Sequence, residues 1–119
     1  MNSKILVLDD DLSNADAIRL VLEDCSFNVR SISLADELSS AVQEFEPDLI
    51  VMDILLDKGD GRELCNALKT NQRTCHIPVL LITAMLETQA TRIFNLADDI
   101  IYKPFSYNKL YTKVASLIN

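Results

Sequence analysis

Short apolar runs alternate along this chain with longer segments in which apolar residues recur every three or four positions, and this alternation restricts the possible folds more than any other feature. Five of the runs are strand candidates: residues 5–8, 28–33, 49–52, 79–83 and 100–102. The intervening segments have the period of amphipathic helices. Strands and helices in alternation are typical of βαβ units around a parallel sheet, so the sequence predicts a single α/β domain over residues 1–119.

The expected helices are defined by the spacing of their apolar side chains. These are Ile18, Leu22 and Cys25 in the first, Leu34, Leu38, Ala41, Val42 and Phe45 in the second, Leu64 and Leu68 in the third, Leu86, Ala90, Ile93, Phe94 and Ala97 in the fourth, and Leu110, Val114 and Leu117 in the fifth. Pro47 precedes the third strand and Pro104 precedes the last helix, where proline commonly marks a boundary. The predicted architecture is therefore (βα)5.

The connections between these units limit how the strands can be ordered. Crossovers between parallel strands are right-handed, which leaves few arrangements of five units. We expect the doubly wound, flavodoxin-like order 2-1-3-4-5, in which ligands bind at the carboxyl ends of the strands near the switch between strands 1 and 3. The runs at 5–8, 49–52 and 79–83 are apolar throughout, as central strands covered on both faces are.

Charge and composition exclude several classes of function. The 18 acidic residues outnumber the 11 basic ones, for a net charge of −7, so we expect no direct nucleic-acid binding by this domain. The apolar run at 5–8 is too short for a signal sequence or a membrane span. The three cysteines lack metal-type spacing, which indicates reduced thiols and a cytoplasmic location.

Polar residues stand where four of the expected strands end. They are Asp9, Asp10 and Asp11 after the first strand, Asp53 after the third, Thr83 and Ala84 at the fourth, and Lys103 after the fifth. Each alone has a structural explanation, as a helix cap, a loop carboxylate, a strand residue or a surface lysine. Because all these strand ends meet at one edge of the sheet, their coincidence indicates a functional site. His76 lies before the fourth strand, at the opposite edge, and is expected to be non-catalytic.

The acidic residues predict a metal ion at this edge. Asp9, Asp10 and Asp53 would repel one another at short range unless a cation lay between them. Mg2+ prefers carboxylate oxygens, waters and phosphate, whereas a site without His or Cys suits Zn2+ poorly. Lys103 would supply a positive charge for a phosphoryl oxygen and Thr83 a hydroxyl donor.

Five motifs in order along the chain carry a family resemblance. They are KILVLDDD at 4–11, PDLIVMD at 47–53, GDG at 59–61, PVLLITA at 78–84 and YKPF at 102–105. Together they resemble the receiver domains of response regulators in two-component signalling, over the whole chain. The resemblance implies that Asp53 accepts a phosphoryl group from a sensor histidine kinase or a histidine phosphotransfer protein. Such a domain catalyses its own phosphorylation and dephosphorylation and is not a turnover enzyme.

The resemblance also implies roles for the neighbours of Asp53. Asp10 and Asp53 would bind Mg2+, or Mn2+ in its place, directly, Asp9 would do so through water, and the backbone carbonyl of Leu55 would be a further ligand. The phosphoryl oxygens would contact Lys103, Thr83 and the backbone N–H of Ala84. The peptide bond before Pro104 is often cis in such domains. Phosphorylation would then alter the face formed by helix 4, strand 5 and helix 5, which an unknown output protein or domain reads.

Four features depart from the family pattern. Ile100 stands where a Tyr or Phe switch residue is usual, and Tyr102, on the same face of the strand, is either a substitute or a surface residue. Asp57 stands where proline is common. The stretch from Thr83 to Lys103 is about two residues short, with Leu96 in place of the glycine that usually ends helix 4. The site is also flanked by Leu55 and Met85, which are apolar where many relatives are polar.

Two alternatives remain open from the sequence. A pseudo-receiver would keep the fold and act by protein binding without phosphorylation, an interpretation that Ile100 and the altered helix 4 favour. A haloacid-dehalogenase-like phosphatase would use residues 9–13, which fit a D-x-D-x-[TVS] nucleophile loop, but it leaves Asp53 without a role. Turnover of a small phosphate ester distinguishes this enzyme from a domain that phosphorylates itself once.

Overall fold

A computed structural model describes residues 2–118. Five parallel strands form the central sheet: β1 (Lys4–Leu8), β2 (Asn28–Ile32), β3 (Leu49–Asp53), β6 (Val79–Thr83) and β7 (Asp99–Tyr102). Their order is β2-β1-β3-β6-β7, which confirms the predicted order 2-1-3-4-5 and the flavodoxin-like fold. No helix within 2–118 has both the length and the apolar composition needed to cross a membrane.

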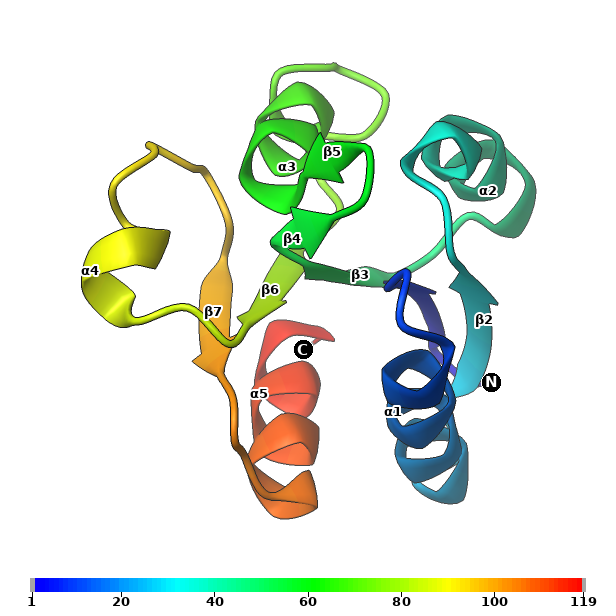
Figure 1. Ribbon diagram of the computed structural model, residues 1–119. Coiled ribbons are helices and arrows are strands. Elements are labelled where there is room, and N and C mark those ends of the chain that lie inside the picture. The colour runs from blue at the N-terminus through cyan, green and yellow to red at the C-terminus, as the bar shows by residue number, and fades with distance from the viewer. Residues whose placement is uncertain (1, 119) are drawn as a thin grey trace.

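Helices cover both faces of the sheet (Figure 1). The helices α1 (Leu12–Asp24) and α5 (Tyr107–Ile118) lie on one face, and α2 (Leu38–Phe45) and α3 (Gly61–Lys69) lie on the other. The short helix α4 (Glu87–Ala90) lies beside the edge strand β7. Side chains that alternate along each strand therefore enter two separate apolar cores, one on either face of the sheet. The sheet, which is packed on both faces, therefore holds the residues at the strand ends in fixed positions.

The start of the second predicted helix is wrong by four residues. Leu34 has an extended backbone and precedes a 3-10 turn, η1 (Ala35–Glu37), and α2 begins only at Leu38. The Glu37 carboxylate accepts a hydrogen bond from the Leu34 N–H at 3.1 Å. This local bond tightens the chain into a 3-10 turn before the α-helix begins. The apolar spacing from Leu38 to Phe45 is otherwise helical, as predicted.

A small hairpin that the sequence did not predict follows the third strand of the sheet. It pairs β4 (Leu55–Leu56) with β5 (Gly59–Asp60), and α3 starts directly after it at Gly61. The Gly61 N–H donates to the Ile54 carbonyl at 2.8 Å. A β-carbon at Gly61 would lie 3.0 Å from the Ile54 α-carbon and would collide with the Asp53 carbonyl oxygen. Glycine is therefore required here to seat α3 against the end of β3.

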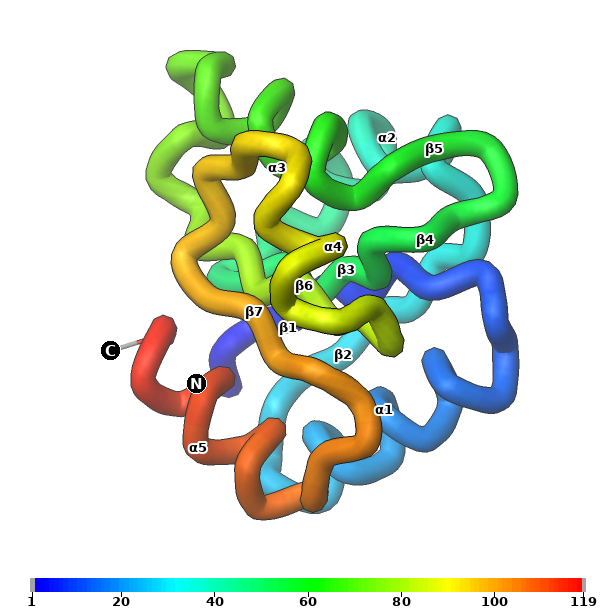
Figure 2. The backbone as a smooth tube through the Cα atoms, turned by 60° about the vertical axis from the view of Figure 1, so that its left-hand side comes forward, coloured from blue at the N-terminus to red at the C-terminus, as the bar shows by residue number. Residues whose placement is uncertain are grey.

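The predicted fourth helix is wrong in length. The sequence pattern spans residues 86–97, but α4 contains only the four residues from Glu87 to Ala90. Beyond it the chain is irregular and returns past α3 to β7, as Figure 2 shows. Asn95 forms local bonds there: its side chain donates to the Ile93 carbonyl at 3.4 Å and accepts from the Ala97 N–H at 3.2 Å. Such side-chain bonds compete with the helical ladder, which explains the early end.

Candidate functional site

The polar strand ends converge at one edge of the sheet, as predicted. Asp53 is the last residue of β3 and Thr83 the last of β6, while Asp9 directly follows β1 and Lys103 directly follows β7. The register of the sheet aligns Asp53 with Ile82 and Thr83 with Tyr102, so these ends lie at nearly the same level. Buried parallel strands thus bring together four side chains that are far apart in the sequence.

Asp53 has the geometry of an accessible carboxylate beside a fixed cation. Its Oδ2 lies 3.5 Å from Lys103 Nζ, and its Oδ1 accepts a hydrogen bond from the Leu55 N–H at 3.3 Å. The Asp53 side chain keeps 13% of its surface exposed. The Lys103–Pro104 peptide bond is cis, as the resemblance implies. An ion pair of this length leaves both groups free to take closer partners.

Asp9 is buried at the same edge. The pKa of Asp9 is raised to about 6, chiefly because the group is buried; the Asp53 and Asp10 carboxylates add to the rise, and the Asp11 N–H and Lys103 oppose it. Its Oδ1 accepts a hydrogen bond from the Asp11 N–H at 2.9 Å. The raised pKa reflects an acidic group that has lost its water and that faces other carboxylates. The electrostatic crowding predicted from the sequence is therefore present at Asp9.

Asp10 is held by the loop that follows Asp53. Its Oδ2 accepts a hydrogen bond from the Asp57 N–H at 2.6 Å. Asp57 occupies the position where proline is common in the family, and proline has no N–H to donate. The departure noted in the sequence therefore gives Asp10 a backbone partner that the usual residue would not provide.

The carboxylates are not assembled into a ready-made metal cage. Within residues 2–118, no group of three or more His, Cys, Asp or Glu side chains is placed to surround a metal ion. The predicted convergence of Asp9, Asp10 and Asp53 is incomplete because Asp10 turns toward the Asp57 N–H and Asp53 toward Lys103. Mg2+ nevertheless needs only one or two carboxylates with waters and phosphate oxygens. The donor set, hard oxygens around an accessible carboxylate, fits that ion.

Thr83 and Ala84 border the site on the β6 side. Thr83 is fully buried, and its Oγ1 accepts a hydrogen bond from the Met85 N–H at 3.0 Å. A hydroxyl that accepts one bond still has its own hydrogen to donate. Ala84 is exposed and presents only a methyl group. This side of the site therefore offers a hydroxyl donor and little steric obstruction.

One departure from the family pattern, Ile100, lies on β7, and Tyr102 follows it two residues later. Ile100 and Tyr102 are both half-buried and pack against the apolar core beneath α2 and α3. The two side chains share a face of the strand, as predicted, and Tyr102 is a partly buried residue at the surface. Burial is the main cause that raises the pKa of Tyr102, with contributions from Glu87 and Asp99. His76 is exposed at the opposite end of the sheet, in an open groove.

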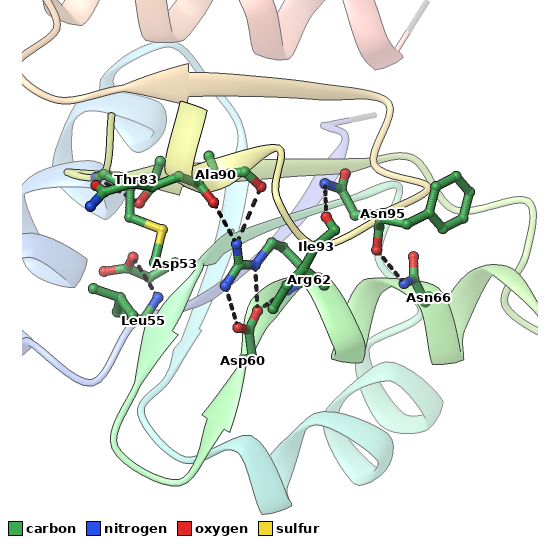
Figure 3. A network of polar contacts seen from close by, with 12 residues as sticks. Asp53, Leu55, Asp60, Arg62, Asn66, Thr83, Ala90, Ile93 and Asn95 are labelled. Carbon is green, nitrogen blue, oxygen red and sulfur yellow. Dashed lines mark hydrogen bonds and ion pairs between the residues drawn. The ribbon is translucent and has the colours of Figure 1, made fainter. Parts of the chain in front are cut away.

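One charged pair near the site was missed by sequence reasoning. Arg62 is only 4% exposed and forms an ion pair of 2.6 Å with Asp60. Figure 3 shows this pair below Ala90 at the end of α4, with Asp53 further to the left. The sequence did contain an indication of this pair, because Arg62 shares a helical face with Cys65 and Leu68, which are both buried. A charge on an apolar face of a helix implies a buried partner.

Comparisons with known proteins agree with this arrangement. The alkaline phosphatase synthesis transcriptional regulatory protein PhoP of Bacillus subtilis is 35% identical over 121 residues, covering 99% of this chain and 49% of that protein. The DNA-binding regulator RpaA of Synechocystis is 31% identical over 117 residues, covering 97% of this chain and 48% of that protein. The chain thus spans about half the length of either relative.

A solved structure has the same fold. The signal receiver domain of a response regulator from Bermanella marisrubri superposes with a TM-score of 0.89 at 26% identity, covering 100% of both chains. The sequence also matches the response regulator receiver domain family over residues 5–115. This match rules out the dehalogenase-like alternative. With the match extending over nearly all of its sheet and helices, the chain belongs to the receiver domain family of two-component response regulators.

Proposed function

We propose that this receiver domain accepts a phosphoryl group on Asp53 and passes the change to the face formed by α4, β7 and α5. The donor is a sensor histidine kinase or a histidine phosphotransfer protein, as is general for response regulators. The observation that carries the proposal is the accessible Asp53 carboxylate 3.5 Å from Lys103 Nζ, at the end of a buried strand. A carboxylate in that position is fixed by the sheet but open to a partner.

In the transfer, an Asp53 carboxylate oxygen forms a bond to phosphorus as the bond from phosphorus to the donor imidazole nitrogen breaks. The imidazole leaves with the electron pair of that bond, and the product is an acyl phosphate. Phosphoryl transfer has a loose transition state, so the protein contributes mainly position and charge neutralisation. Lys103 provides a positive charge for one phosphoryl oxygen. The Thr83 hydroxyl and the Ala84 N–H provide donors for the others.

The residues that would hold Mg2+ or Mn2+ are Asp10, Asp53, the Leu55 carbonyl and, through water, Asp9. A bound divalent ion neutralises charge on the carboxylates and on the phosphoryl oxygens. Asp10 already has one oxygen engaged by the Asp57 N–H, which fixes its side chain and leaves the other oxygen available. Asp9 loses its proton more readily when positive charge lies nearby, because the carboxylates that raise its pKa are then compensated.

A small phosphodonor with Mg2+ tests this function. Acetyl phosphate or phosphoramidate should add one phosphoryl group to the domain, measured by intact mass, and Asp53→Asn should abolish the addition. Asp48→Asn is a matched control, since Asp48 precedes the same strand at its opposite end. A wild-type domain that acquires no phosphoryl group would favour the pseudo-receiver alternative. Labelling that persists in Asp53→Asn would assign the acceptor to another residue.

A further inference from the structure

Arg62 is a buried charge that the proposed chemistry does not use. The buried polar residues of the described chain are Asp9, Arg62 and Thr83, and the other two belong to the site. Burying a guanidinium is costly unless all its donors find partners. A single partner, Asp60, would satisfy only one edge of the guanidinium group. The partners of the remaining Arg62 donors therefore show which part of the chain this residue holds in place.

Those donors bind the end of α4. Arg62 Nη1 donates to the Gln89 carbonyl at 3.0 Å and to the Ala90 carbonyl at 3.3 Å, while Nε and Nη2 bind the two oxygens of Asp60 at 2.9 and 2.6 Å. Figure 3 shows the guanidinium between Asp60 and the end of α4. Carbonyls at the end of a helix lack partners within the helix and carry partial negative charge. Arg62 donates to two of them from a neighbouring element, and the Gln89 carbonyl also accepts from the Arg92 N–H at 3.3 Å.

The helix α4 is too short to be stable by itself. It has four residues, whereas isolated helices of fewer than about 12 residues are marginal in water. Its own cap is a hydrogen bond of 3.2 Å from the Leu86 N–H to the Gln89 side chain. Ala90 is fully buried but contributes only a methyl group to the core. The stability of α4 must therefore come largely from tertiary contacts such as those of Arg62.

A second side chain on the same face of α3 holds the chain that follows. Asn66, one helical turn after Arg62, donates to the Phe94 carbonyl at 2.9 Å and accepts from the Leu96 N–H at 2.8 Å. Phe94 itself remains 72% exposed, so its ring does not anchor the segment. Arg62 and Asn66 thus supply backbone partners that a longer helix would have supplied internally. This accounts for how the segment stays ordered without the predicted helix.

Arg62 is also tied to the phosphorylation site through the backbone. Asp60 accepts a hydrogen bond from the Arg62 N–H at 2.8 Å and so caps α3. Gly61, between them, lies against the Asp53 carbonyl without space for a β-carbon. A shift of the backbone at Asp53 therefore displaces the residues that orient the Arg62 side chain.

We propose that Arg62 is a positioning residue that holds α4 in place and transmits the state of Asp53 to it. The contact runs from the Asp53 backbone through Gly61 and the Asp60–Arg62 pair to the carbonyls of Gln89 and Ala90. This route is distinct from the Thr83 hydroxyl, which reaches the chain before α4 through the Met85 N–H. The holding role concerns the unmodified domain, whereas the transmitting role rests on the proposed function.

Amide hydrogen exchange in the unmodified domain tests the holding role without phosphorylation. The Ala90 and Thr91 amides bond to the Leu86 and Glu87 carbonyls within α4. In Arg62→Met their exchange should accelerate by about 10- to 100-fold, as expected from the loss of the charge-assisted hydrogen bonds to the Gln89 and Ala90 carbonyls. Arg19→Met, at a half-buried arginine of α1 that contacts only its own helix through ion pairs, is the matched control and should leave them unchanged. Unchanged exchange in Arg62→Met would overturn the proposal.

A second variant guards against a general loss of structure. Arg62→Lys keeps the charge but lacks the planar fork that binds Asp60 and two carbonyls at once. It should also accelerate exchange at Ala90 and Thr91 while amides of β1 and β3 stay protected. If Arg62→Met fails to fold, this variant decides, and protected α4 amides in Arg62→Lys would refute the holding role.

The transmitting role is tested with beryllofluoride, which mimics the acyl phosphate. Intact mass after acetyl phosphate treatment first establishes that Asp53 of Arg62→Lys still accepts one phosphoryl group. The backbone NMR shifts that beryllofluoride causes in residues 87–91 should then fall at least several-fold below those of the wild type, while the shifts around Asp53 persist. Full-sized α4 shifts would overturn transmission through Arg62. Loss of labelling in the wild type as well would instead contradict the proposed function.

Discussion

The carboxyl edge of the sheet and the segment after β6 are held in opposite ways. At the edge, Asp53 and Thr83 end strands whose preceding residues are all buried. In the segment, α4 has one turn, and Ile93 and Phe94 are exposed. The edge is fixed by apolar cores on both faces, while the segment is fixed by a few polar contacts from α3. Because the segment after β6 has few buried contacts per residue, we expect its local stability to be lower than that of the edge.

This contrast suits a domain that keeps its chemistry constant and changes its readout. The groups proposed to act in phosphoryl transfer must stay aligned within a fraction of an ångström, which buried strands achieve. A readout element must shift at low energetic cost, which a segment held by four hydrogen bonds with two side chains of α3 can do. The two regions meet at Gly61, where α3 contacts the backbone of Asp53.

The largest loss of stability is expected from a substitution at this junction. Gly61→Ala would force a β-carbon against the Asp53 carbonyl and the Ile54 α-carbon, neither of which is a flexible side-chain end. We expect a loss of about 3 kcal/mol in the free energy of unfolding, near the upper end of overpacking costs, despite the higher helix propensity of alanine. Denaturant titration measures it.

Gly59→Ala provides the comparison for this variant. A β-carbon at Gly59 would meet Ala35 at 3.4 Å, an ordinary van der Waals contact. The unfolding free energy should therefore change by less than about 0.5 kcal/mol. Equal effects of the two substitutions would show that the close approach of α3 to Asp53 is not what makes Gly61 necessary.

The sequence predicted the edge well because its positions follow from burial. Runs of apolar residues at 49–52 and 79–83 specify strands, and in a parallel sheet the residue after each strand has only one edge to occupy. The placement of Asp53 and Thr83 and the approach of Lys103 follow from that rule, while the strand order follows from the handedness of the crossovers. The rule does not predict the direction of each side chain. Asp10, for example, points toward the Asp57 N–H and not toward the other carboxylates.

The segment after β6 was predicted less well because its conformation depends on partners distant in the sequence. Helical periodicity from Leu86 to Ala97 describes which side chains are apolar, but the backbone from Gln89 to Leu96 bonds to Arg62 and Asn66. No local pattern encodes a hydrogen bond across about 28 residues. The hairpin of β4 and β5 was missed for a related reason, since two-residue strands have no detectable period.

The next effect concerns how the two regions communicate. Thr83→Ala should leave Asp53 able to accept a phosphoryl group but should abolish the part of the α4 response that passes through the Met85 N–H. Ile100→Ala should instead cost about 1–2 kcal/mol of stability, because Ile100 is a half-buried side chain in the core. Beryllofluoride-induced NMR shifts, with unfolding titrations, separate these outcomes. Complete loss of the α4 response in a folded Ile100→Ala would show that β7 carries the signal.

A smaller effect is expected from Mg2+ at the edge. At a tenfold excess over its dissociation constant, an ion that binds only the folded state adds about 1.4 kcal/mol. Asp10→Ala should remove most of this stabilisation, measured as the Mg2+-dependent rise in melting temperature. If millimolar Mg2+ leaves the wild-type melting temperature unchanged at low ionic strength, the metal assignment is wrong.

The Asp57 N–H allows a sharper version of the Mg2+ measurement. Asp57→Pro removes the donor that holds Asp10, whereas Asp57→Ala keeps the donor and removes the same charge. We therefore expect the two variants to differ in Mg2+ affinity by several-fold. The sign of this difference shows how the hydrogen bond from the Asp57 N–H to Asp10 affects metal binding. A higher affinity in Asp57→Pro would mean that the bond withholds Asp10 from the ion, and a lower affinity would mean that it orients Asp10. Identical affinities would show that the bond has no influence on the site.

The smallest effect is the pH dependence of the pair that holds α4. The Arg62 guanidinium, through its hydrogen bonds, is the main cause that holds the pKa of Asp60 below its usual value of 3.8. A carboxyl whose pKa is depressed by folding stabilises the protein above its unfolded pKa, and this contribution is lost as the pH falls through the folded value. The difference in unfolding free energy between the wild type and Asp60→Asn, about 1 kcal/mol at pH 7, should therefore shrink below pH of about 4. Asp16→Asn, which removes an exposed partner of Arg19 on α1, should show a much weaker dependence over the same range. If the wild type remains more stable than Asp60→Asn by the same amount at low pH, the Asp60–Arg62 pair stabilises the protein by packing rather than by charge. In that case α4 is held by side-chain packing near Gly61, as the carboxyl edge of the sheet is held by its buried strands.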